Sequence, residues 1–273
     1  MKKVDLFDIS GKVIIITGGA GALGGSMAAY LIELGAKIVI LDLFPKNVEE
    51  RVAELKKLSP NVIGISGSVL DEKHLKKAKT EVLEKWSKID VLINAAGGNM
   101  PGATIGEDQT IFDLNIEDFK KVSELNLNGS VLPSMVFGEV MAKQLFGSIV
   151  NISSMTATQA VTRVVGYSAS KAAIDIFTKW MATELALKFE GSVRVNAIAP
   201  GFFIGNQNRA LLTNSDGSYT ERGHTIIKNT PMKRFGNPDE LNGAIHWLIS
   251  DAASFVTGTI IPIDGGFSAF SGV

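Results

Sequence analysis

The stretch Val13-Ile14-Ile15-Ile16-Thr17-Gly18-Gly19-Ala20-Gly21-Ala22-Leu23-Gly24-Gly25 decides the fold expected for this 273-residue chain. Its first five residues are all β-branched, which is typical of a strand buried on both faces. The glycines lead into a helix-patterned segment, residues 26–34, and a second apolar strand, residues 37–41, ends at Asp42. Strand, helix and strand in this order predict a βαβ unit with two parallel strands.

The glycines of this unit match the pattern Gly19-x-Gly21-x-x-Gly24. Such glycines permit a tight turn and let backbone N–H groups approach a pyrophosphate at the helix N-terminus. A glycine turn alone can be merely structural. Here it follows a strand, opens a helix and precedes an acidic residue at the end of the next strand, so the sequence predicts a dinucleotide site.

Asp42 is the acidic residue of that pattern. Its carboxylate is expected to accept hydrogen bonds from the adenosine ribose hydroxyls and to repel a 2′-phosphate. This favours NAD over NADP as the cofactor. Lys46 is close enough in sequence to weaken the preference.

Composition excludes several classes of function. Formal net charge is −1, so no overall basic field points to nucleic acid or an anionic membrane surface. The chain has no cysteine and three scattered histidines, so we expect no disulfide, no thiolate chemistry and no metal site. The N-terminal residues lack the apolar run of a signal peptide, and no apolar run is long enough to span a bilayer. These features predict a soluble cytoplasmic protein.

Strand and helix patterns alternate along the whole chain without a linker or repeat. We therefore predict a single doubly wound α/β domain of Rossmann type over residues 1–273, with a mostly parallel seven-stranded sheet and helices on both faces. The predicted strands are 13–17, 37–41, 62–66, 91–93, 148–154, 193–199 and 259–263, and the predicted helices are 26–34, 46–58, 72–86, 116–143, 166–189 and 238–250.

Polar and small residues follow the predicted strands where an open parallel sheet holds its ligands. The fourth strand ends in Asn94-Ala95-Ala96-Gly97-Gly98-Asn99, and the fifth ends in Ser153-Ser154. Small residues would let a cofactor lie against the backbone, although an ordinary turn also uses them. Asn126, within the long predicted helix, is a polar residue among apolar neighbours and could simply make a structural hydrogen bond.

Tyr167 and Lys171 lie four residues apart at the start of the 166–189 helix. That spacing places both side chains on one helix face. A nearby cation favours phenolate over phenol, so Tyr167 is a candidate general acid or base. The same spacing also occurs by chance on surface helices. Because Ser154 ends the preceding strand, it is expected to converge with this pair.

Residues 202–230 are mixed in character and interpreted as a mobile substrate lid. Phe202 and Phe203 are followed by Gly205-Asn206-Gln207-Asn208-Arg209 and then by a stretch rich in Gly, Ser, Asn and Asp. Amides and a guanidinium of this kind can bind several hydroxyls and a carboxylate.

Taken in order, these motifs resemble the classical short-chain dehydrogenases/reductases over essentially the whole chain. The resemblance rests on the glycine turn, Asn94-Ala95-Ala96-Gly97, Asn126, Ser154, Tyr167-x-x-x-Lys171, Pro200-Gly201, Thr257-Gly258 and Asp264-Gly265-Gly266. It implies that Tyr167 exchanges a proton with the substrate, Ser154 holds the substrate oxygen, Lys171 binds the nicotinamide ribose and Asn126 anchors a water relay. It places cofactor contacts at Gly18, Gly21, Ala22, Leu23, Gly24, Asp42, Ser68, Val69, Asn94, Ala95, Ala96, Gly97, Tyr167, Lys171, Pro200, Gly201 and Phe203.

Three positions depart from the family pattern. The second glycine of the turn falls at Ala22, with Gly21 just before it. Ser68-Val69 stands where an Asp commonly contacts adenine. Gly205 replaces a Thr that often touches the pyrophosphate. None of these changes removes a catalytic group.

The segments after Pro200, around Thr230-Pro231-Met232 and at the C-terminus resemble the D-mannonate oxidoreductase, or fructuronate reductase, branch of the family. The resemblance implies NAD-dependent interconversion of D-mannonate and D-fructuronate by a homotetramer, whose 116–143 and 166–190 helices form one interface and whose C-terminal strand lies near another. The residues assigned to the substrate are Asn99, Ser154, Arg163, Tyr167, Asn206, Asn208 and Arg209. Alternatives are another sugar acid or polyol, such as gluconate/5-ketogluconate, and a non-catalytic dinucleotide-binding protein.

Overall fold

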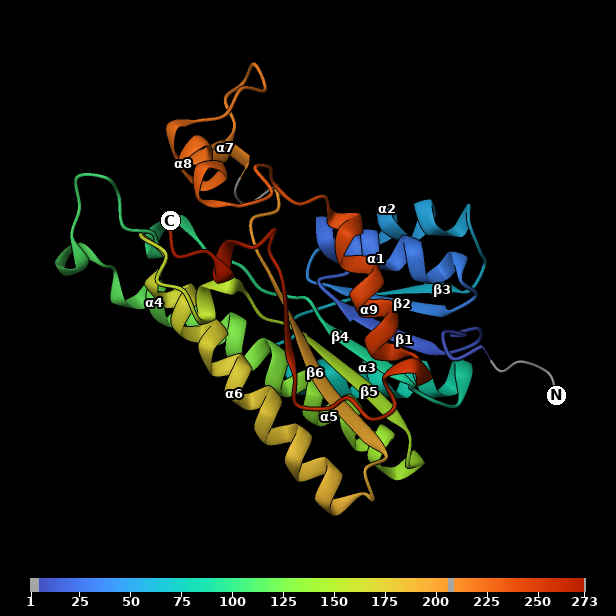
Figure 1. The fold of residues 1–273 in the computed structure, drawn as a ribbon. Helices are drawn as coiled ribbons and strands as arrows, with labels where there is room; N and C mark the ends of the chain where they lie inside the picture. The colour runs from blue at the N-terminus through green and yellow to red at the C-terminus, as the bar shows by residue number, and fades with distance from the viewer. Residues whose placement is uncertain (1–4, 206–208, 273) are drawn as a thin grey trace.

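The computed structural model describes residues 5–205 and 209–272, which form a seven-stranded sheet covered by helices (Figure 1). The strand order is β3-β2-β1-β4-β5-β6-β7, and each pair of neighbours is parallel. The predicted doubly wound α/β sheet is confirmed. The strands are β1 (Val13–Thr17), β2 (Lys37–Asp42), β3 (Val62–Ser66), β4 (Val91–Asn94), β5 (Gly147–Ile152), β6 (Val193–Pro200) and β7 (Ile260–Ile263).

The order reverses beside β1, which pairs with β2 on one side and with β4 on the other. In such sheets the chain leaves neighbouring strands in opposite directions at the switch point, and a crevice opens at the carboxyl ends. Thr17 is the register partner of Asn94 there. The glycine turn after β1 and the Ala95–Gly98 loop after β4 therefore start side by side.

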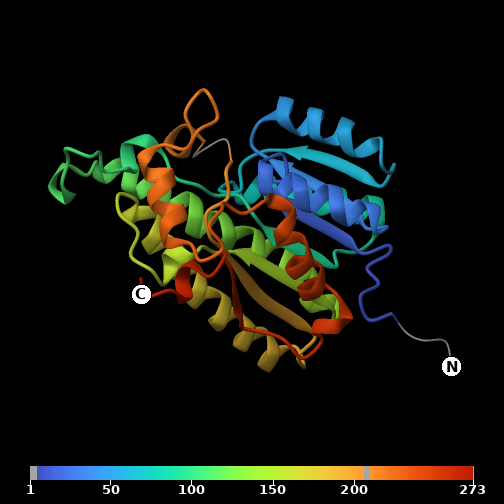
Figure 2. The same ribbon diagram turned by 45° about the horizontal axis from the view of Figure 1, so that its top comes forward.

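Alternating residues of β1 divide the core into two layers, because successive strand side chains point to opposite faces. Ile14 and Ile16 pack with residues of α1 (Ala22–Glu33), α2 (Pro45–Lys56) and α9 (Asn242–Ile249). Val13 and Ile15 pack with α3 (Glu72–Trp86), α5 (Gly129–Gln144) and α6 (Val165–Lys188). Figure 2 shows the two helix layers on either side of the sheet.

The long helix predicted over 116–143 is interrupted. It consists of α4 (Ile116–Ser123), a π-helical segment η3 (Glu124–Asn128) and α5. A π-turn adds one residue to the helical register and often marks a functional position. Periodicity could not reveal it, because Asn126 is the buried residue of η3 and its hydrogen bonds join segments distant in sequence.

Other element boundaries also differ from the predictions. Helix α1 begins at Ala22 rather than Ser26, so the last glycines of the turn already belong to its first turn. The predicted 238–250 helix is a 3₁₀ turn, η5 (Pro238–Leu241), followed by α9. Further 3₁₀ turns are η1 (Pro101–Ala103), η2 (Ile111–Asp113), η4 (Met155–Ala157), η6 (Asp251–Ala253) and η7 (Phe267–Ala269).

Two short helices occupy the segment interpreted as a lid, α7 (Arg209–Leu212) and α8 (Glu221–Asn229). They lie beyond the upper edge of the sheet in Figure 1, on the side where β6 ends. Leu212, Ile226 and Phe235 form a small apolar cluster of their own beneath them. Among the helices of the described residues, none has the length and apolar character needed to cross a bilayer.

Candidate active site

The glycine turn lies against the loop that follows β4. Gly18 has φ +64°, and a Cβ added to it would lie 2.8 Å from the carbonyl oxygen of Ala95. A Cβ on Gly24 would lie 2.5 Å from the Gly18 carbonyl oxygen. Only glycine fits either position, because a Cβ would clash with the backbone at both, and an L-residue at Gly18 would also be strained by its positive φ.

Helix α1 begins at this turn without a side-chain cap. Its N-cap residue, Gly21, is extended, and both Gly21 and Ala22 are exposed. The first N–H groups of a helix have no intrahelical partner and carry a partial positive charge, which suits an anion. The turn therefore fits the pyrophosphate of a dinucleotide, which the backbone at Ala22, Leu23 and Gly24 would contact.

Asp42 lies next to the same turn. Its Oδ2 accepts from the Ala20 N–H at 3.1 Å, and its Oδ1 accepts from the Leu43 N–H at 2.8 Å. The carboxylate is half-buried and keeps lone pairs that can accept from ribose hydroxyls. The predicted neighbourhood of Asp42 and the glycine turn is thus present in the fold.

Thr17 is a residue of this site that the sequence reasoning did not assign a role. Its hydroxyl, fully buried, accepts from the N–H groups of both Ala95 and Ala96 at 3.1 Å. The bonds tie the β4 loop to the end of β1 and hold Ala96 and Gly97 at the crevice. A hydroxyl as the last residue of an all-aliphatic strand was the available signal.

The Asn94 side chain is directed into the core, so the predicted cofactor contact cannot come from its amide as placed here. Its Nδ2 donates to Ser134 Oγ and to Asn151 Oδ1, both at 2.8 Å. Asn151 in turn donates to Thr178 Oγ1 of α6 at 2.9 Å. This buried network joins β4, β5, α5 and α6 below the crevice.

Asn126 of η3 makes the second link to the β4 loop. Its Nδ2 donates to the carbonyl oxygens of Gly98, at 2.7 Å, and Val122, at 2.8 Å, while its Oδ1 accepts from the Gly98 N–H at 3.1 Å. A Cβ on Gly97 would come within 2.7 Å of this Oδ1. The structural interpretation of the amide is therefore confirmed, and the water relay stays a prediction.

Ser154, Tyr167 and Lys171 are brought together at the end of β5. The hydroxyl of Tyr167 is hydrogen bonded to Ser154, and Ser154 Oγ also accepts from the N–H and the hydroxyl of Thr156. Lys171 Nζ donates to the Ile152 carbonyl oxygen at 2.7 Å and lies 5.5 Å from the Tyr167 ring centroid. The shared helix face predicted for Tyr167 and Lys171 is confirmed.

The pKa of Tyr167 is shifted in the direction opposite to the expected one. Burial raises the pKa of the Tyr167 phenol above its ordinary value, and the hydrogen bond to Ser154 acts in the lowering direction. Burial also lowers the pKa of the Lys171 ammonium to about 8, against the effect of Asp175. The expected lowering of the Tyr167 pKa by Lys171 was wrong for the chain alone, because desolvation outweighs the distant cation.

The remaining cofactor positions lie around the crevice with their side chains engaged elsewhere. Ser68 Oγ accepts from the Leu70 N–H at 3.1 Å, and Val69 is buried near Gly129 of α5. Gly201 touches Asp264, since a Cβ there would lie 2.6 Å from its Cα. The ring of Phe203 is buried in the apolar core. At these positions a cofactor contact would fall to the backbone.

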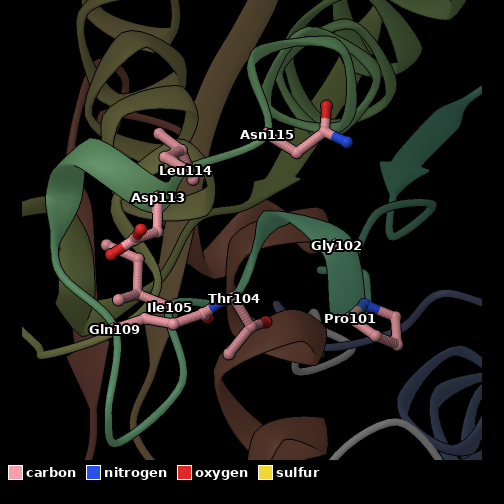
Figure 3. Close-up of a pocket in the computed structure, with 8 residues that line it drawn as sticks. All are labelled: Pro101, Gly102, Thr104, Ile105, Gln109, Asp113, Leu114 and Asn115. Atoms are coloured by element: carbon pink, nitrogen blue, oxygen red, sulfur yellow. The ribbon is translucent and has the colours of Figure 1, made fainter.

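The long loop after β4 holds a hollow of about 240 Å³ that is separate from Tyr167 and Lys171. Figure 3 shows the residues between Pro101 and Asn115 that line it. Asn99, just before it, donates to Thr104 Oγ1 at 2.7 Å, and its buried Oδ1 has no hydrogen-bond partner among the described residues. An orphaned amide oxygen in the loop after β4 suits the predicted hydroxyl-rich substrate.

The predicted substrate residues do not all gather at one place. Arg163, with φ +78°, donates from Nε to the Ile105 carbonyl oxygen at 2.8 Å and pairs with Glu107 at 3.2 Å. Arg209 is exposed at the start of α7. Asn206 and Asn208 lie outside the described residues.

Arg222 of α8 is a second cation at this edge, and the sequence reasoning missed it. Its two terminal nitrogens donate to the hydroxyl and carbonyl oxygens of Thr162, at 3.4 and 3.3 Å. Burial lowers the pKa of its guanidinium, the charge of Arg163 lowers it further, and Glu107 acts in the opposite direction. Arg163 is thus paired with Glu107 of the loop after β4, and the charges of both groups act on Arg222.

Known proteins resemble this chain over nearly its full length. The family profile described as Enoyl-(Acyl carrier protein) reductase matches residues 18–268. An uncharacterised oxidoreductase of Bacillus subtilis, UxuB, is 43% identical, and the alignment covers 97% of this chain and 98% of that protein.

Two solved structures are similar as well. A candidate D-mannonate oxidoreductase from Haemophilus influenza, with bound NAD, is 39% identical and superposes with a TM-score of 0.89, covering 97% of this chain and 98% of that one. A candidate gluconate dehydrogenase from Agrobacterium tumefaciens is 29% identical, with a TM-score of 0.87 and coverage of 97% and 99%. The fold, the Ser154–Tyr167–Lys171 cluster and these matches lead to one conclusion: the chain is an oxidoreductase that belongs to the short-chain dehydrogenase/reductase family.

Proposed function

We propose that this oxidoreductase transfers a hydride between NAD(H) and a sugar acid, with D-mannonate/D-fructuronate as the preferred pair. The observation that carries the proposal is the hydrogen-bonded Ser154–Tyr167 pair, with Lys171 behind it, at the crevice that the glycine turn and the β4 loop also border. This arrangement supports proton transfer and cofactor binding at one edge of the sheet.

The chain's own residues have one proton to handle. Bound NAD would supply the hydride chemistry, which no side chain can. In alcohol oxidation, Tyr167 as phenolate takes the hydroxyl proton, while Ser154 hydrogen-bonds the substrate oxygen as its C–O bond becomes C=O. In ketone reduction, the Tyr167 phenol gives the proton back and Ser154 stabilises the negative charge that develops on the oxygen. Lys171 contributes its positive charge beside Tyr167 and would bind the ribose of the cofactor.

NAD rather than NADP is proposed because of Asp42. A carboxylate that touches Ala20 of the glycine turn stands where a ribose hydroxyl is expected and would repel a 2′-phosphate. We expect Asp42→Ala to raise kcat/KM for NADP(H) relative to NAD(H) by about tenfold, the effect of removing one unfavourable charge contact. A wild-type preference for NADP(H) would overturn this part of the proposal.

An acidic substrate is proposed because of the cations near the loop that precedes Tyr167. Arg163 and Arg222 act on each other electrostatically, and Glu107, whose side chain is 83% exposed, acts on both. A carboxylate arriving there would meet two guanidinium groups, which bind such anions through paired hydrogen bonds. Arg163 is held by Ile105 at 2.8 Å, whereas Arg222 makes only longer contacts, 3.3 and 3.4 Å, to Thr162, so we infer that Arg222 is the donor more easily redirected to a substrate.

Gluconate/5-ketogluconate is the second candidate pair, favoured by the similarity to the Agrobacterium structure. A neutral polyol would offer neither guanidinium group a carboxylate. A non-catalytic dinucleotide-binding role is less favoured, because the Tyr167, Lys171 and Ser154 side chains are assembled together.

The assembly proposed is a homotetramer in the cytoplasm. An exposed apolar stripe on α6 supports one interface: Ile176 is 64% exposed, Trp180 62% and Leu187 77%. Strand β7 forms the edge of the sheet and supports the other. The absence of cysteine suits a reducing compartment. Residues 202–230 are proposed to move over bound substrate, with α8 carrying Arg222 toward it.

The test is a substrate panel followed by NADH or NADPH absorbance. D-mannonate, D-fructuronate, D-gluconate, 5-ketogluconate and D-mannitol are each assayed with both cofactors. We expect the highest kcat/KM for the mannonate/fructuronate pair with NAD(H) and at least about tenfold less for mannitol. No turnover of any sugar acid would reject the function. Light scattering tests the tetramer, expected at four times the 29.1 kDa of one chain.

A further inference from the structure

Lys171 is a buried cation whose hydrogen-bond partner is uncharged. Its side chain is 4% exposed, and Nζ donates to the Ile152 carbonyl oxygen at 2.7 Å. An ammonium group withdrawn from water is costly unless negative charge lies nearby. Whether Lys171 stays protonated therefore depends on the charged groups near its ammonium.

Asp175 lies one turn further along α6, on the same face as Lys171. Its Oδ1 accepts from Ser153 Oγ at 2.5 Å. Ser153 directly follows Ile152, whose carbonyl oxygen holds Lys171. The two side chains thus bind adjacent residues at the end of β5, and Asp175 brings a carboxylate to the cluster.

The charges around the pair are few. Asp175 is the charged group that acts on Lys171, and it opposes the lowering of the Lys171 pKa by burial. Burial raises the pKa of Asp175, whereas the hydrogen bond from Ser153 and the charges of Lys179 and Lys171 lower it. The Tyr167 ring, on the same helix, also faces Lys171, while β5 contributes a hydroxyl and a carbonyl.

We propose that Asp175 is a positioning residue that keeps Lys171 protonated at the pH where the enzyme works. The carboxylate, anchored by Ser153, offsets part of the desolvation of the buried ammonium. The importance of this role for catalysis rests on the proposed function of the Tyr167–Lys171 pair. The effect of Asp175 on the protonation of Lys171 can be measured whether or not that function is correct. None of the roles assigned above to the catalytic cluster includes Asp175.

The direction of the effect follows from the charge. Below pH 8 most of the Lys171 side chains carry a proton, because burial lowers its pKa to about 8. Removing the negative charge of Asp175 destabilises the ammonium further, so Lys171 loses its proton at a lower pH. The alkaline limit of ribose binding and turnover then moves to lower pH as well.

The experiment compares the full-length protein with Asp175→Asn, which keeps the shape of the side chain and its ability to bond Ser153. Lys171 is titrated by NMR in cofactor-free protein labelled at lysine Cε, with its signal assigned from Lys171→Met. We expect the Asp175→Asn midpoint to fall by about one pH unit, as for loss of an opposite charge one helical turn away. The pH profiles of NADH affinity and kcat/KM should shift in the same direction.

The matched control is Glu184→Gln on the same helix, 13 residues beyond Lys171 and about 20 Å along the axis. It should leave the Lys171 midpoint unchanged. Asp175→Glu, which keeps the negative charge, should have a midpoint close to that of the wild type. An unchanged midpoint in folded Asp175→Asn overturns the proposal. If that variant does not fold, Ser153→Ala decides, since it should lower the midpoint by a smaller amount, and no change there also overturns it. Failure of the sugar-acid panel would reject the proposed function and leave this titration readable.

Discussion

The floor of the crevice and its rim are built differently. The floor consists of the ends of β4 and β5, segment η3 and the start of α6, where Asn126 is 0% and Ser154 7% exposed. The rim consists of residues 99–115, residues 158–164 and helices α7 and α8, where Phe112 is 93% exposed. The floor holds reacting groups by buried hydrogen bonds, whereas the rim places charges on exposed loops. Changes in the floor should therefore affect turnover, and changes in the rim should affect substrate affinity.

The strongest test of this comparison is Tyr167→Phe in the floor. The ring still fills its half-buried place, but the proton donor is lost. We expect kcat to fall by about a thousandfold, within the range for removing a general acid or base. NADH affinity, measured by fluorescence titration, should stay within about threefold, because the hydroxyl is one of many cofactor contacts. Near wild-type kcat would remove Tyr167 from the chemistry.

The next test, Gly97→Ala, changes the floor without removing a reacting group. The added Cβ would press on Asn126 Oδ1 and lie 3.5 Å from Lys171 Nζ. We expect kcat to fall by about 10- to 100-fold, since misplacement of reacting groups by about 1 Å has costs of that order. Gly243→Ala in α9 is the control, because a Cβ there meets nothing within 4 Å. Equal kcat in both variants would show that the floor tolerates displacement.

In the rim, Arg222→Met should act on KM. Losing one charge-assisted contact to the substrate carboxylate should raise KM for D-mannonate by about 10- to 100-fold, the equivalent of 1.5–3 kcal/mol. Turnover of a neutral polyol at saturation should not change. Arg209→Met is the matched control on α7 and should have the smaller effect. Equal losses for acid and polyol would mean that Arg222 supports the lid rather than recognises the carboxylate.

The smallest effect is expected for Glu107→Gln. Its ion pair with Arg163 spans 3.2 Å but is largely solvated. Exposed ion pairs contribute about 0–1 kcal/mol, so stability should change little. KM for a sugar acid should fall by about twofold or less, since a competing carboxylate is gone, and kcat should remain as in wild type. A large fall in kcat would show that the rim also orders the floor.

Local pattern was enough to predict much of the molecule. The β-branched run before the glycine turn, the charge at Asp42 and the spacing of Tyr167 and Lys171 each depend on residues close in sequence. The doubly wound fold, the resemblance to the family and the nearness of Ser154 to Tyr167 were predicted from these and similar motifs. Arg222 and Asp175 escaped notice, because an arginine in a polar helix and an aspartate in a long helix carry no local signal of function.

The amino-acid sequence by itself determined the parallel sheet, the dinucleotide crevice and the residue types available for proton transfer, because periodicity and glycine chemistry act over short range. Only the tertiary structure decided what those residues experience. Packing from distant segments turned Asn94 into the core, joined Asn126 to Gly98, and through burial raised the pKa of Tyr167 and lowered the pKa of Lys171. Desolvation and long-range hydrogen bonds arise from contacts between segments far apart in the chain, so no local pattern encodes them.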